Sequence, residues 1–287
     1  MTGPVLVTGA TGFIGRALAE RLRKDKYDIV ALGSAQGDIA DPATLAPYHG
    51  RDLACVFHLA ALTYVPASWK DPRAFERVNV GGTRNVLSLC AAARAPLIYM
   101  SAYVYGVVGS QPINEDVGPS PNNPYAESKL LAEEACRAHA SASGVPVTVL
   151  RPFNVYGPGQ PKQFLIPTIL KQVLDGHAVE VADLEPRRDW IFADDVAEAA
   201  VAAAQKSGGY RVYNIGSGVS VSVAELIGRI QALAQTRLPV RSRKERRSQE
   251  IADTVADISR AKRELSWSPA VSLDEGLQRC LEAMRNQ

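Results

Sequence analysis

The sequence lacks several features that define whole classes of protein. Its 287 residues carry 32 basic and 30 acidic side chains, a net charge of +2. This balance is too even for a chain whose main partner is nucleic acid. The basic residues between positions 237 and 247 are interrupted by Glu245 and form a mixed run, not a block. The longest apolar runs, such as residues 199–204, are too short to cross a bilayer.

Cysteine is also scarce. Cys55, Cys90, Cys136 and Cys280 lie far apart and show no metal-ligand spacing. We interpret them as buried or incidental thiols of a reducing compartment, and we expect no metal site. The chain reaches an apolar segment within a few residues of Met1, without the pattern of a signal peptide. We therefore expect a soluble, cytoplasmic protein, whose 46% hydrophobic content suffices for one large domain or two modest ones.

A glycine-rich turn follows the first predicted strand. Residues 4–8 form an apolar run typical of a buried parallel strand, and residues 9–15 read Gly-Ala-Thr-Gly-Phe-Ile-Gly before an amphipathic helix. Gly9 permits the tight turn, Gly12 lets a pyrophosphate approach the backbone, and Gly15 lets the helix pack close to the sheet. The helix N-terminus offers N–H groups to the phosphates. This segment predicts a dinucleotide site.

The end of the second predicted strand, residues 28–32, bears on the choice of cofactor. Dinucleotide folds often place an acid here for the adenosine ribose 2′-hydroxyl, but this strand runs into Gly-Ser-Ala-Gln at residues 33–36. An acid would repel a 2′-phosphate, so its absence permits NADP. Arg16 and Ser34 could reach that phosphate. We slightly favour NADP over NAD.

Asp38 and His58 each allow a structural and a functional interpretation. Asp38 either lies in a loop that flanks the adenine or caps a helix before Pro42, and both interpretations stay open. His58 lies inside the apolar strand of residues 54–61, so we interpret it as structural. That strand ends in small residues, as is needed where the backbone approaches a ligand.

Tyr125 and Lys129 form the pattern with the most direct chemical meaning. At positions i and i+4 of a predicted helix they share one face. An ammonium beside a phenol favours the phenolate and lowers the tyrosine pKa, which makes the phenol a usable acid or base. Ser101 ends the predicted strand of residues 97–101. Its hydroxyl can hydrogen-bond a substrate oxygen while the Tyr–Lys pair supplies or takes the proton.

The rhythm of strands and helices changes after about residue 157. We expect Asp194 or Asp195 to cap an alanine-rich helix. We also expect a smaller second lobe built from the later segments, some of which return to the first lobe, with the substrate between the lobes. The further segments predicted are strands at residues 179–181 and 212–215, and helices at residues 166–174, 223–234 and 259–265 and from residue 273.

Together these motifs resemble those of the extended short-chain dehydrogenase/reductases, which are nucleotide-sugar epimerases, dehydratases and reductases. The resemblance covers nearly the whole chain. The motifs shared in order and spacing are Gly9-x-x-Gly12-x-x-Gly15, His58-Leu59-Ala60-Ala61, Asn79-x-x-Gly82-Thr83, Ser101, Tyr125-x-x-x-Lys129, Arg151-Pro152-Phe153-Asn154 and Arg188-Asp189-Trp190.

The resemblance implies an α/β fold. Residues 1–157 would form a Rossmann dinucleotide-binding domain, a doubly wound parallel sheet with helices on both faces. Residues 158–287 would mainly form a smaller α/β substrate lobe for a nucleotide-diphosphate sugar. Relatives often form homodimers through two helices, here residues 79–94 and 125–143, as a four-helix bundle.

The resemblance also implies residue roles on the cofactor side. Tyr125 would be the general acid or base, Lys129 would hold the nicotinamide ribose, and Ser101 would bind and polarise the reacting sugar oxygen. The residues implied to contact NAD or NADP are Gly9, Thr11, Gly12, Phe13, Ile14, Gly15, Arg16, Ser34, Asp38, Ile39, Leu59, Ala60, Ala61, Asn79, Tyr125, Lys129, Pro152 and Val155.

On the substrate side, arginines would bind the sugar diphosphate, because planar donors match phosphate oxygens. Arg247 and Glu250 fall where the family often has Arg-Pro-Gly-Asp or Arg-Pro-Gly-Glu, although Ser-Gln replaces Pro-Gly. The alternative for the arginines is a solvated basic surface. The residues implied to contact the substrate are Thr63, Ser101, Tyr103, Tyr125, Phe153, Asn154, Arg188, Arg247 and Glu250.

The residues after Ser101 narrow the reaction. Dehydratases of this family have Asp-Glu there, whereas this chain has Ala102-Tyr103, which disfavours a 4,6-dehydratase. Residues 58–72 are similar to those of GDP-4-keto-6-deoxy-mannose reductases. We therefore place first an NADPH-dependent reductase of a 4-keto-6-deoxy nucleotide sugar, an enzyme of deoxysugar biosynthesis. A 4-epimerase of the UDP-glucose type comes second, and a non-catalytic NAD(P)-binding protein is disfavoured.

Overall fold

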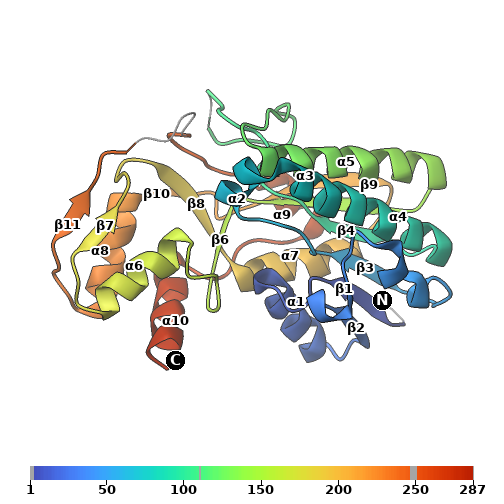
Figure 1. The fold of residues 1–287 in the computed structure, drawn as a ribbon, viewed down its shortest axis with the longest axis horizontal. Coiled ribbons are helices and arrows are strands. Elements are labelled where there is room, and N and C mark those ends of the chain that lie inside the picture. Colours follow the sequence, from blue (N-terminus) through green and yellow to red (C-terminus); the bar gives the residue numbers. More distant parts are fainter. Residues whose placement is uncertain (1–2, 110, 246–250, 287) are drawn as a thin grey trace.

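The computed structural model describes residues 3–109, 111–245 and 251–286, which form two lobes (Figure 1). The larger lobe is built on a six-stranded sheet of order β2-β1-β3-β4-β5-β9, in which neighbouring strands are parallel. The order reverses between β1 and β3, and open α/β sheets bind ligands outside the carboxyl ends at such a point. The strands are β1 (Val5–Thr8), β2 (Ile29–Leu32), β3 (Cys55–His58), β4 (Leu97–Met100), β5 (Val147–Pro152) and β9 (Tyr210–Ile215).

Helices cover both faces of this sheet (Figure 1). Successive strand residues point to opposite faces, so Val5 and Val7 join one apolar core and Leu6 joins the other. The first core includes residues of α1 (Phe13–Lys24), α7 (Ala193–Gln205) and α9 (Ser259–Leu265). The second includes residues of α4 (Gly82–Ala93) and α5 (Pro124–Ser143). The predicted doubly wound parallel sheet is confirmed.

The helical segment that follows β3 is built from several short pieces. After α2 (Val65–Lys70), α3 (Pro72–Phe75) runs into a π-helical segment (Glu76–Gly81) and then α4. A Cβ at Gly82 would lie 2.7 Å from Ile39 Cγ2, whereas Gly81 has open space around it. The Gly pair therefore serves close packing at Gly82 only.

The smaller lobe has its own apolar core. Tyr156, Trp190 and Phe192 lie in it, with Phe192 and Trp190 both edge-on to Tyr156. Its sheets have the orders β10-β8-β6 and β11-β7. Its elements are β6 (Asn154–Tyr156), α6 (Leu165–Leu174), β7 (Val179–Val181), β8 (Arg187–Phe192), β10 (Ser220–Ser222), α8 (Val223–Ala234), β11 (Val240–Ser242) and α10 (Leu273–Arg285).

Several late segments lie in the larger lobe. Strand β9 pairs with β5 at the edge of the main sheet, α7 packs on α1, and α9 packs on β9. The division at residue 157 stays a prediction. All four cysteines are buried. Among the described residues, no helix combines the length and apolarity that a membrane span requires.

The predicted cap of the alanine-rich helix is wrong. Helix α7 starts after Phe192 without a side-chain cap, and Asp194 and Asp195 lie inside its first turn. The Asp195 carboxylate instead accepts from Ala270 N (2.8 Å) and Val271 N (3.1 Å). A distant chain segment uses the acid, which local sequence does not reveal.

Asp38 does not cap a helix either. The 3-10 turn Pro42–Thr44 is capped by Asp41, which accepts from Ala43 N. Asp38 accepts from Ala40 N (2.9 Å) and pairs with Arg77 (2.6 Å), and these contacts lower its carboxyl pKa. Of the two interpretations of Asp38, only the loop position remains.

Candidate active site

The turn between β1 and α1 leaves no room for side chains at two of its glycines. Gly9 has a φ of +69°, and a Cβ there would lie 2.6 Å from Ala60 N. A Cβ at Gly15 would lie 2.0 Å from the Gly9 carbonyl oxygen. Gly12 is the exposed N-cap of α1. Helix α1 therefore packs directly on the turn and presents its N-terminus at the carboxyl edge of the sheet.

This turn fits a dinucleotide. The first α1 hydrogen bond runs from Arg16 N to Gly12 O (3.0 Å), so the N–H groups of residues 13–15 have no acceptor inside the helix. Such groups at the positive end of a helix can bind a pyrophosphate. Ser34 is exposed just after β2, and Ile39 is buried beside Gly82. The residues present thus suit an NAD(P) cofactor.

Arg16 joins the two lobes. Its guanidinium donates to Thr11 O (2.8 Å) and to Gly159 O (3.0 Å), and Phe13 of the same turn packs near Gly157. Its backbone partners place the guanidinium between the glycine turn and the segment that follows β6. A contact of Arg16 with a 2′-phosphate stays a prediction.

His58 has the structural role predicted for it. It is 1% exposed and lies between Thr8 Oγ1 (2.7 Å from Nδ1) and Thr83 Oγ1 (3.0 Å from Nε2). The Thr83 hydroxyl donates to Asn79 O, so His58 Nε2 must donate to Thr83 and Nδ1 must accept from Thr8. Burial lowers the His58 pKa to about 3. The ring is a neutral linker between β1, β3 and α4.

Asn79 holds the segment after β3 in place. Its buried amide accepts from Leu62 N (2.8 Å) and donates to Leu62 O (3.0 Å) and Ser128 Oγ (2.9 Å). The resemblance implies a cofactor contact for Asn79, whereas the structure uses this amide to fix the loop against α5. Thr63, next in the loop, is exposed.

Lys129 points from α5 to the end of β4. Its Nζ donates to Met100 O (2.6 Å) and lies 4.4 Å from the centroid of the Tyr99 ring. One turn earlier, the half-buried Tyr125 packs edge-on against Phe75. Within the described residues, no hydrogen bond involves the Tyr125 hydroxyl. That hydroxyl is free to meet a ligand.

Burial governs the protonation of this pair. It raises the pKa of the Tyr125 phenol, and it lowers the pKa of the Lys129 ammonium to about 7 against the opposing charge of Glu133. The sequence predicts that Lys129 lowers the Tyr125 pKa, and the structure gives the opposite direction. The ammonium points to a carbonyl, and loss of hydration dominates at the phenol. Tyr125 is therefore held protonated at neutral pH.

Ser101 is bound to a carboxylate that the sequence reasoning missed. Ser101 is 3% exposed, and its hydroxyl donates to Glu133 Oε1. Glu133, 2% exposed, forms an ion pair with Arg151 (2.6 Å). A signal was available, because Glu133 follows Tyr125 by eight residues and Lys129 by four, on one face of the helix.

Tyr103 lies close enough to Arg188 of the smaller lobe for the two side chains to interact electrostatically. Its hydroxyl donates to Gly106 O (2.7 Å), and its ring lies edge-on to the buried Phe153 (5.2 Å between centroids). Burial raises the Tyr103 pKa to about 12, and the positive charge of Arg188 opposes that rise. Arg188 of the smaller lobe thus lies close to the first lobe's site.

Strand β8 is tied down around that arginine. Arg188 donates to Ile251 O (2.7 Å), and Asn154 Nδ2 donates to Asp189 O (3.2 Å). The fully buried Asp189 carboxylate accepts from Ser217 N (2.6 Å), Gly218 N (2.9 Å) and Ala256 N (3.0 Å). These bonds hold β8 to two separate chain segments.

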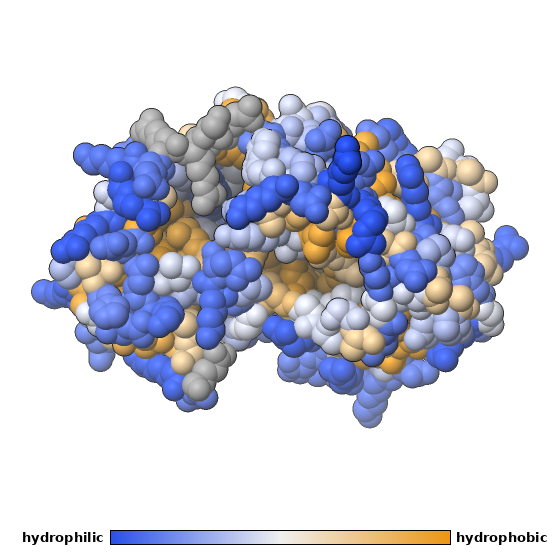
Figure 2. Space-filling model, viewed as in Figure 1, coloured by the Kyte–Doolittle hydropathy of each residue, from blue (hydrophilic) through white to orange (hydrophobic). Residues whose placement is uncertain are grey.

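The structure places the predicted site residues at several locations around the carboxyl edge of the main sheet. Ser101 and Lys129 lie where β4 ends against α5, Tyr125 lies one helical turn before Lys129, and Arg188 approaches from the other lobe. Figure 2 shows a hollow between the lobes with hydrophobic residues on its floor. Leu59, Ala60, Ala61 and Val155 are half-buried and Pro152 is buried, at the ends of β3 and β5. Arg247 and Glu250 lie outside the described residues.

Sequence comparison places this geometry in a family. A profile of the NAD dependent epimerase/dehydratase family matches residues 5–216. The chain belongs to this family. GDP-6-deoxy-D-mannose reductase from Pseudomonas aeruginosa is 32% identical over 98% of this chain and 97% of its own. UDP-glucose 4-epimerase from Mycolicibacterium smegmatis is 31% identical, covering 98% of both chains. dTDP-glucose 4,6-dehydratase from Streptomyces griseus is 34% identical, over 96% of this chain and 92% of its own.

Solved structures of family members superpose on nearly the whole molecule. RMD from Pseudomonas aeruginosa complexed with NADPH has a TM-score of 0.92 at 31% identity, with 99% of both chains covered. UDP-glucose 4-epimerase from Thermotoga maritima with UDP-glucose has a TM-score of 0.91 at 27% identity, with 99% of both chains covered. The extended short-chain dehydrogenase/reductase resemblance is thereby confirmed. The protein is an enzyme of a nicotinamide-dependent family, and nucleotide-sugar chemistry at C4 fits its relatives.

Proposed function

We propose that the protein is an NADPH-dependent reductase of a 4-keto-6-deoxy nucleotide sugar. The observation that carries this proposal is the protonated Tyr125 phenol, free of hydrogen bonds among the described residues, beside Ser101 and Lys129. Reduction of a ketone needs a proton donor at the carbonyl oxygen, and the Tyr125 hydroxyl, which no described residue engages, can serve as that donor. The full-length match to GDP-6-deoxy-D-mannose reductase supports this direction.

Each residue then has a defined task at C4. Bound NADPH would supply a hydride to the carbonyl carbon. Tyr125 Oη donates its proton to the carbonyl oxygen. Lys129, whose ammonium is fixed by Met100 O, would hold the nicotinamide ribose. Arg188 holds the diphosphate of the sugar nucleotide in the second lobe.

A dehydratase lacks its acid and base in this site. Ala102 is buried, and the Tyr103 hydroxyl is engaged with Gly106 O, where the family's dehydratases have Asp-Glu. Glu133 lies near, but its carboxylate is paired with Arg151. The 34% identity to a 4,6-dehydratase therefore reflects a shared fold and not a shared reaction.

The second candidate is a nucleotide-sugar 4-epimerase. It is favoured by the full-length match to UDP-glucose 4-epimerase. It would use the same Tyr125 and Ser101, with NAD oxidising and then reducing C4 in place. A non-catalytic NAD(P)-binding protein is disfavoured, because it would not need the proton donor.

Cofactor retention separates the two candidates. The protein is purified without added cofactor and denatured, and any released nucleotide is identified by chromatography and absorbance. We expect an empty protein that binds NADPH more tightly than NADH, because a consumed cofactor must exchange. Stoichiometric release of NAD⁺ would favour the epimerase and reject the reductase.

We also propose a cytoplasmic homodimer formed through α4 and α5, with a half-exposed Leu131 on α5 within the contact. Light scattering of the purified protein tests this assembly. A dimer mass that Leu131→Glu reduces to a monomer mass supports it, and a monomer mass for the unaltered protein contradicts it.

A further inference from the structure

The hydrogen of the Ser101 hydroxyl is committed inside the protein. Ser101 Oγ donates to Glu133 Oε1. The Arg151 guanidinium donates to both Glu133 oxygens (Nε to Oε1, 3.0 Å; Nη2 to Oε2, 2.6 Å), so the oxygen that Ser101 meets is an acceptor. A hydroxyl has one hydrogen. What Ser101 has left to offer is its capacity to accept.

Arg151 is itself fixed by a second partner. Its Nη1 donates to the Tyr105 hydroxyl oxygen (2.9 Å), and its guanidinium carbon lies 5.0 Å from the Tyr105 ring centroid. The Tyr105 hydroxyl in turn donates to Asn214 Oδ1 (2.7 Å). Ser101, Glu133, Arg151, Tyr105 and Asn214 are each at most 5% exposed. Each donor in this series of hydrogen bonds therefore points to a fixed acceptor and has little freedom to rotate.

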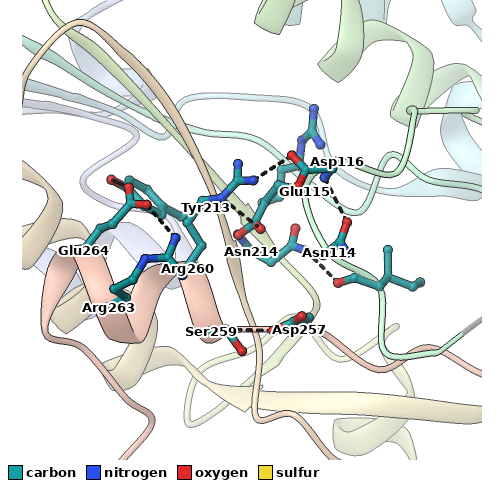
Figure 3. A network of polar contacts seen from close by, with 12 residues as sticks. Asn114, Glu115, Asp116, Tyr213, Asn214, Asp257, Ser259, Arg260, Arg263 and Glu264 are labelled. Atoms are coloured by element: carbon teal, nitrogen blue, oxygen red, sulfur yellow. Dashed lines mark hydrogen bonds and ion pairs between the residues drawn. The ribbon is translucent and has the colours of Figure 1, made fainter.

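Asn214, the member of this hydrogen-bond series farthest from Ser101, is bonded to the segment of residues 113–115 (Figure 3). Asn214 Nδ2 donates to Ile113 O (2.9 Å), and Asn214 N donates to Glu115 Oε1 (2.7 Å). Arg260 of α9 pairs with Asp116 (2.7 Å) and lies 3.5 Å from Glu115. Tyr105 and the segment of residues 113–115 thus bond Asn214 directly, and Arg260 holds that segment through Asp116 and Glu115.

We propose that Glu133 is a positioning residue, held by Arg151 and Tyr105, which turns the Ser101 hydroxyl so that it meets the reacting sugar oxygen only as a hydrogen-bond acceptor. This inference rests on the proposed function in taking that oxygen as the one on C4. It revises the role that the resemblance implies, in which Ser101 polarises the carbonyl. Ser101 accepts from the C4 hydroxyl of the alcohol, and Tyr125 is the one donor to the ketone.

A double-mutant cycle tests whether Glu133 acts through Ser101. Ser101→Ala, Glu133→Gln and the double variant are compared with the unaltered enzyme in NADPH-dependent reduction of a GDP-linked 4-keto-6-deoxy sugar. We expect each single change to weaken binding of the 4-hydroxy product about tenfold, measured as its inhibition constant, because Ser101 accepts only from the alcohol; KM for NADPH should not change. The inhibition constant for the double variant should lie within about twofold of that for the weaker-binding single variant, because coupled residues are non-additive. Losses that multiply would overturn the proposal, since they would show that Glu133 acts independently of Ser101.

Asp195→Asn is the matched control. Asp195 is also 2% exposed, and among the described residues its carboxylate accepts from the backbone N–H groups of residues 270 and 271. The inhibition constant of the 4-hydroxy product for Asp195→Asn should stay within about twofold of the value for the unaltered enzyme. If Glu133→Gln does not fold, Tyr105→Phe takes its place in the cycle. That change keeps the Glu133–Arg151 pair and removes one support, and the same non-additivity with Ser101→Ala is expected.

A neutron crystal structure of the deuterated protein tests the proposal without the need for enzymatic turnover. A deuterium on Ser101 Oγ directed at Glu133 Oε1 supports it. A deuterium directed away from Glu133, or located on Glu133, overturns it. If the enzyme reduces no 4-keto sugar, the proposed function fails, while this measurement still decides the direction of the Ser101 hydrogen.

Discussion

At the scale of single residues, Tyr125 carries the proton that reduction requires, and its surroundings determine the protonation state of its phenol. Burial keeps the phenol protonated, and no partner among the described residues competes for its hydrogen. Tyr125→Phe should lower kcat by about 10²–10⁴-fold, the usual worth of a positioned acid, and leave NADPH binding intact. Initial rates and a fluorescence titration with NADPH measure the two quantities. Tyr27→Phe, at the amino end of β2, is the control and should change neither; a Tyr125→Phe enzyme with full kcat would contradict the assignment.

Lys129 should give stability a distinctive pH dependence. Its pKa is about 7 in the folded protein against an ordinary 10.5. Between these pH values the unfolded chain binds one more proton, so the group makes the free energy of unfolding rise with pH, by about 1.4 kcal/mol per pH unit at most. Lys129→Met removes this slope. Urea unfolding of both proteins from about pH 7 to pH 9 should show the unaltered protein gaining on the variant, and a constant difference would contradict the lowered pKa.

At the scale of elements, the glycine turn is packed so closely that it has no room for a side chain at Gly9 or Gly15. Gly15→Ala places a Cβ against the Gly9 carbonyl oxygen and forces α1 away from the turn. We expect a loss of about 1–3 kcal/mol in the free energy of unfolding and weaker NADPH binding. Gly228→Ala is the matched control, because a Cβ there meets nothing within 4 Å in the middle of α8. It should raise stability by about 0.5–1 kcal/mol and leave NADPH binding unchanged. Thermal unfolding and titration distinguish the pair, and equal effects at both positions would refute the packing argument.

Local patterns were enough to predict most elements but not their contacts. Helix α8 spans the predicted residues 223–234, since an apolar periodicity and a capping box of Ser222 and Glu225 are both local. The Ser101–Glu133 bond joins residues 32 apart in the chain, and Asp195 meets Ala270 across 75. Sequence spacing shows which residues share a helix face, but not which strand end that face meets. The direction of the Tyr125 pKa failed for the same reason, because burial depends on the assembled fold.

At the scale of the whole molecule, the two lobes should separate cofactor binding from substrate binding. The glycine turn lies in the larger lobe, and Arg188 reaches the site from β8 of the smaller one. Arg188→Ala should raise KM for the nucleotide sugar by about 10–100-fold, as expected for loss of a charge-assisted contact to phosphate. The dissociation constant for NADPH should not change.

Arg229→Ala is the control for this separation. Arg229 also belongs to the smaller lobe, but it is exposed on α8 and pairs with Asp274. Its loss should leave both KM and NADPH binding unchanged. If Arg188→Ala weakened NADPH as much as the sugar nucleotide, the assignment of one ligand to each lobe would fail.

The stoichiometry of reduction tests the central claim most directly. The enzyme is incubated with NADPH and a GDP-linked 4-keto-6-deoxy sugar, and the NADPH oxidised is compared with the 4-hydroxy product formed. The account predicts one NADPH consumed for each alcohol produced. Conversion of UDP-glucose to its C4 epimer without net consumption of NADPH, and no reduction of the 4-keto sugar, would contradict it.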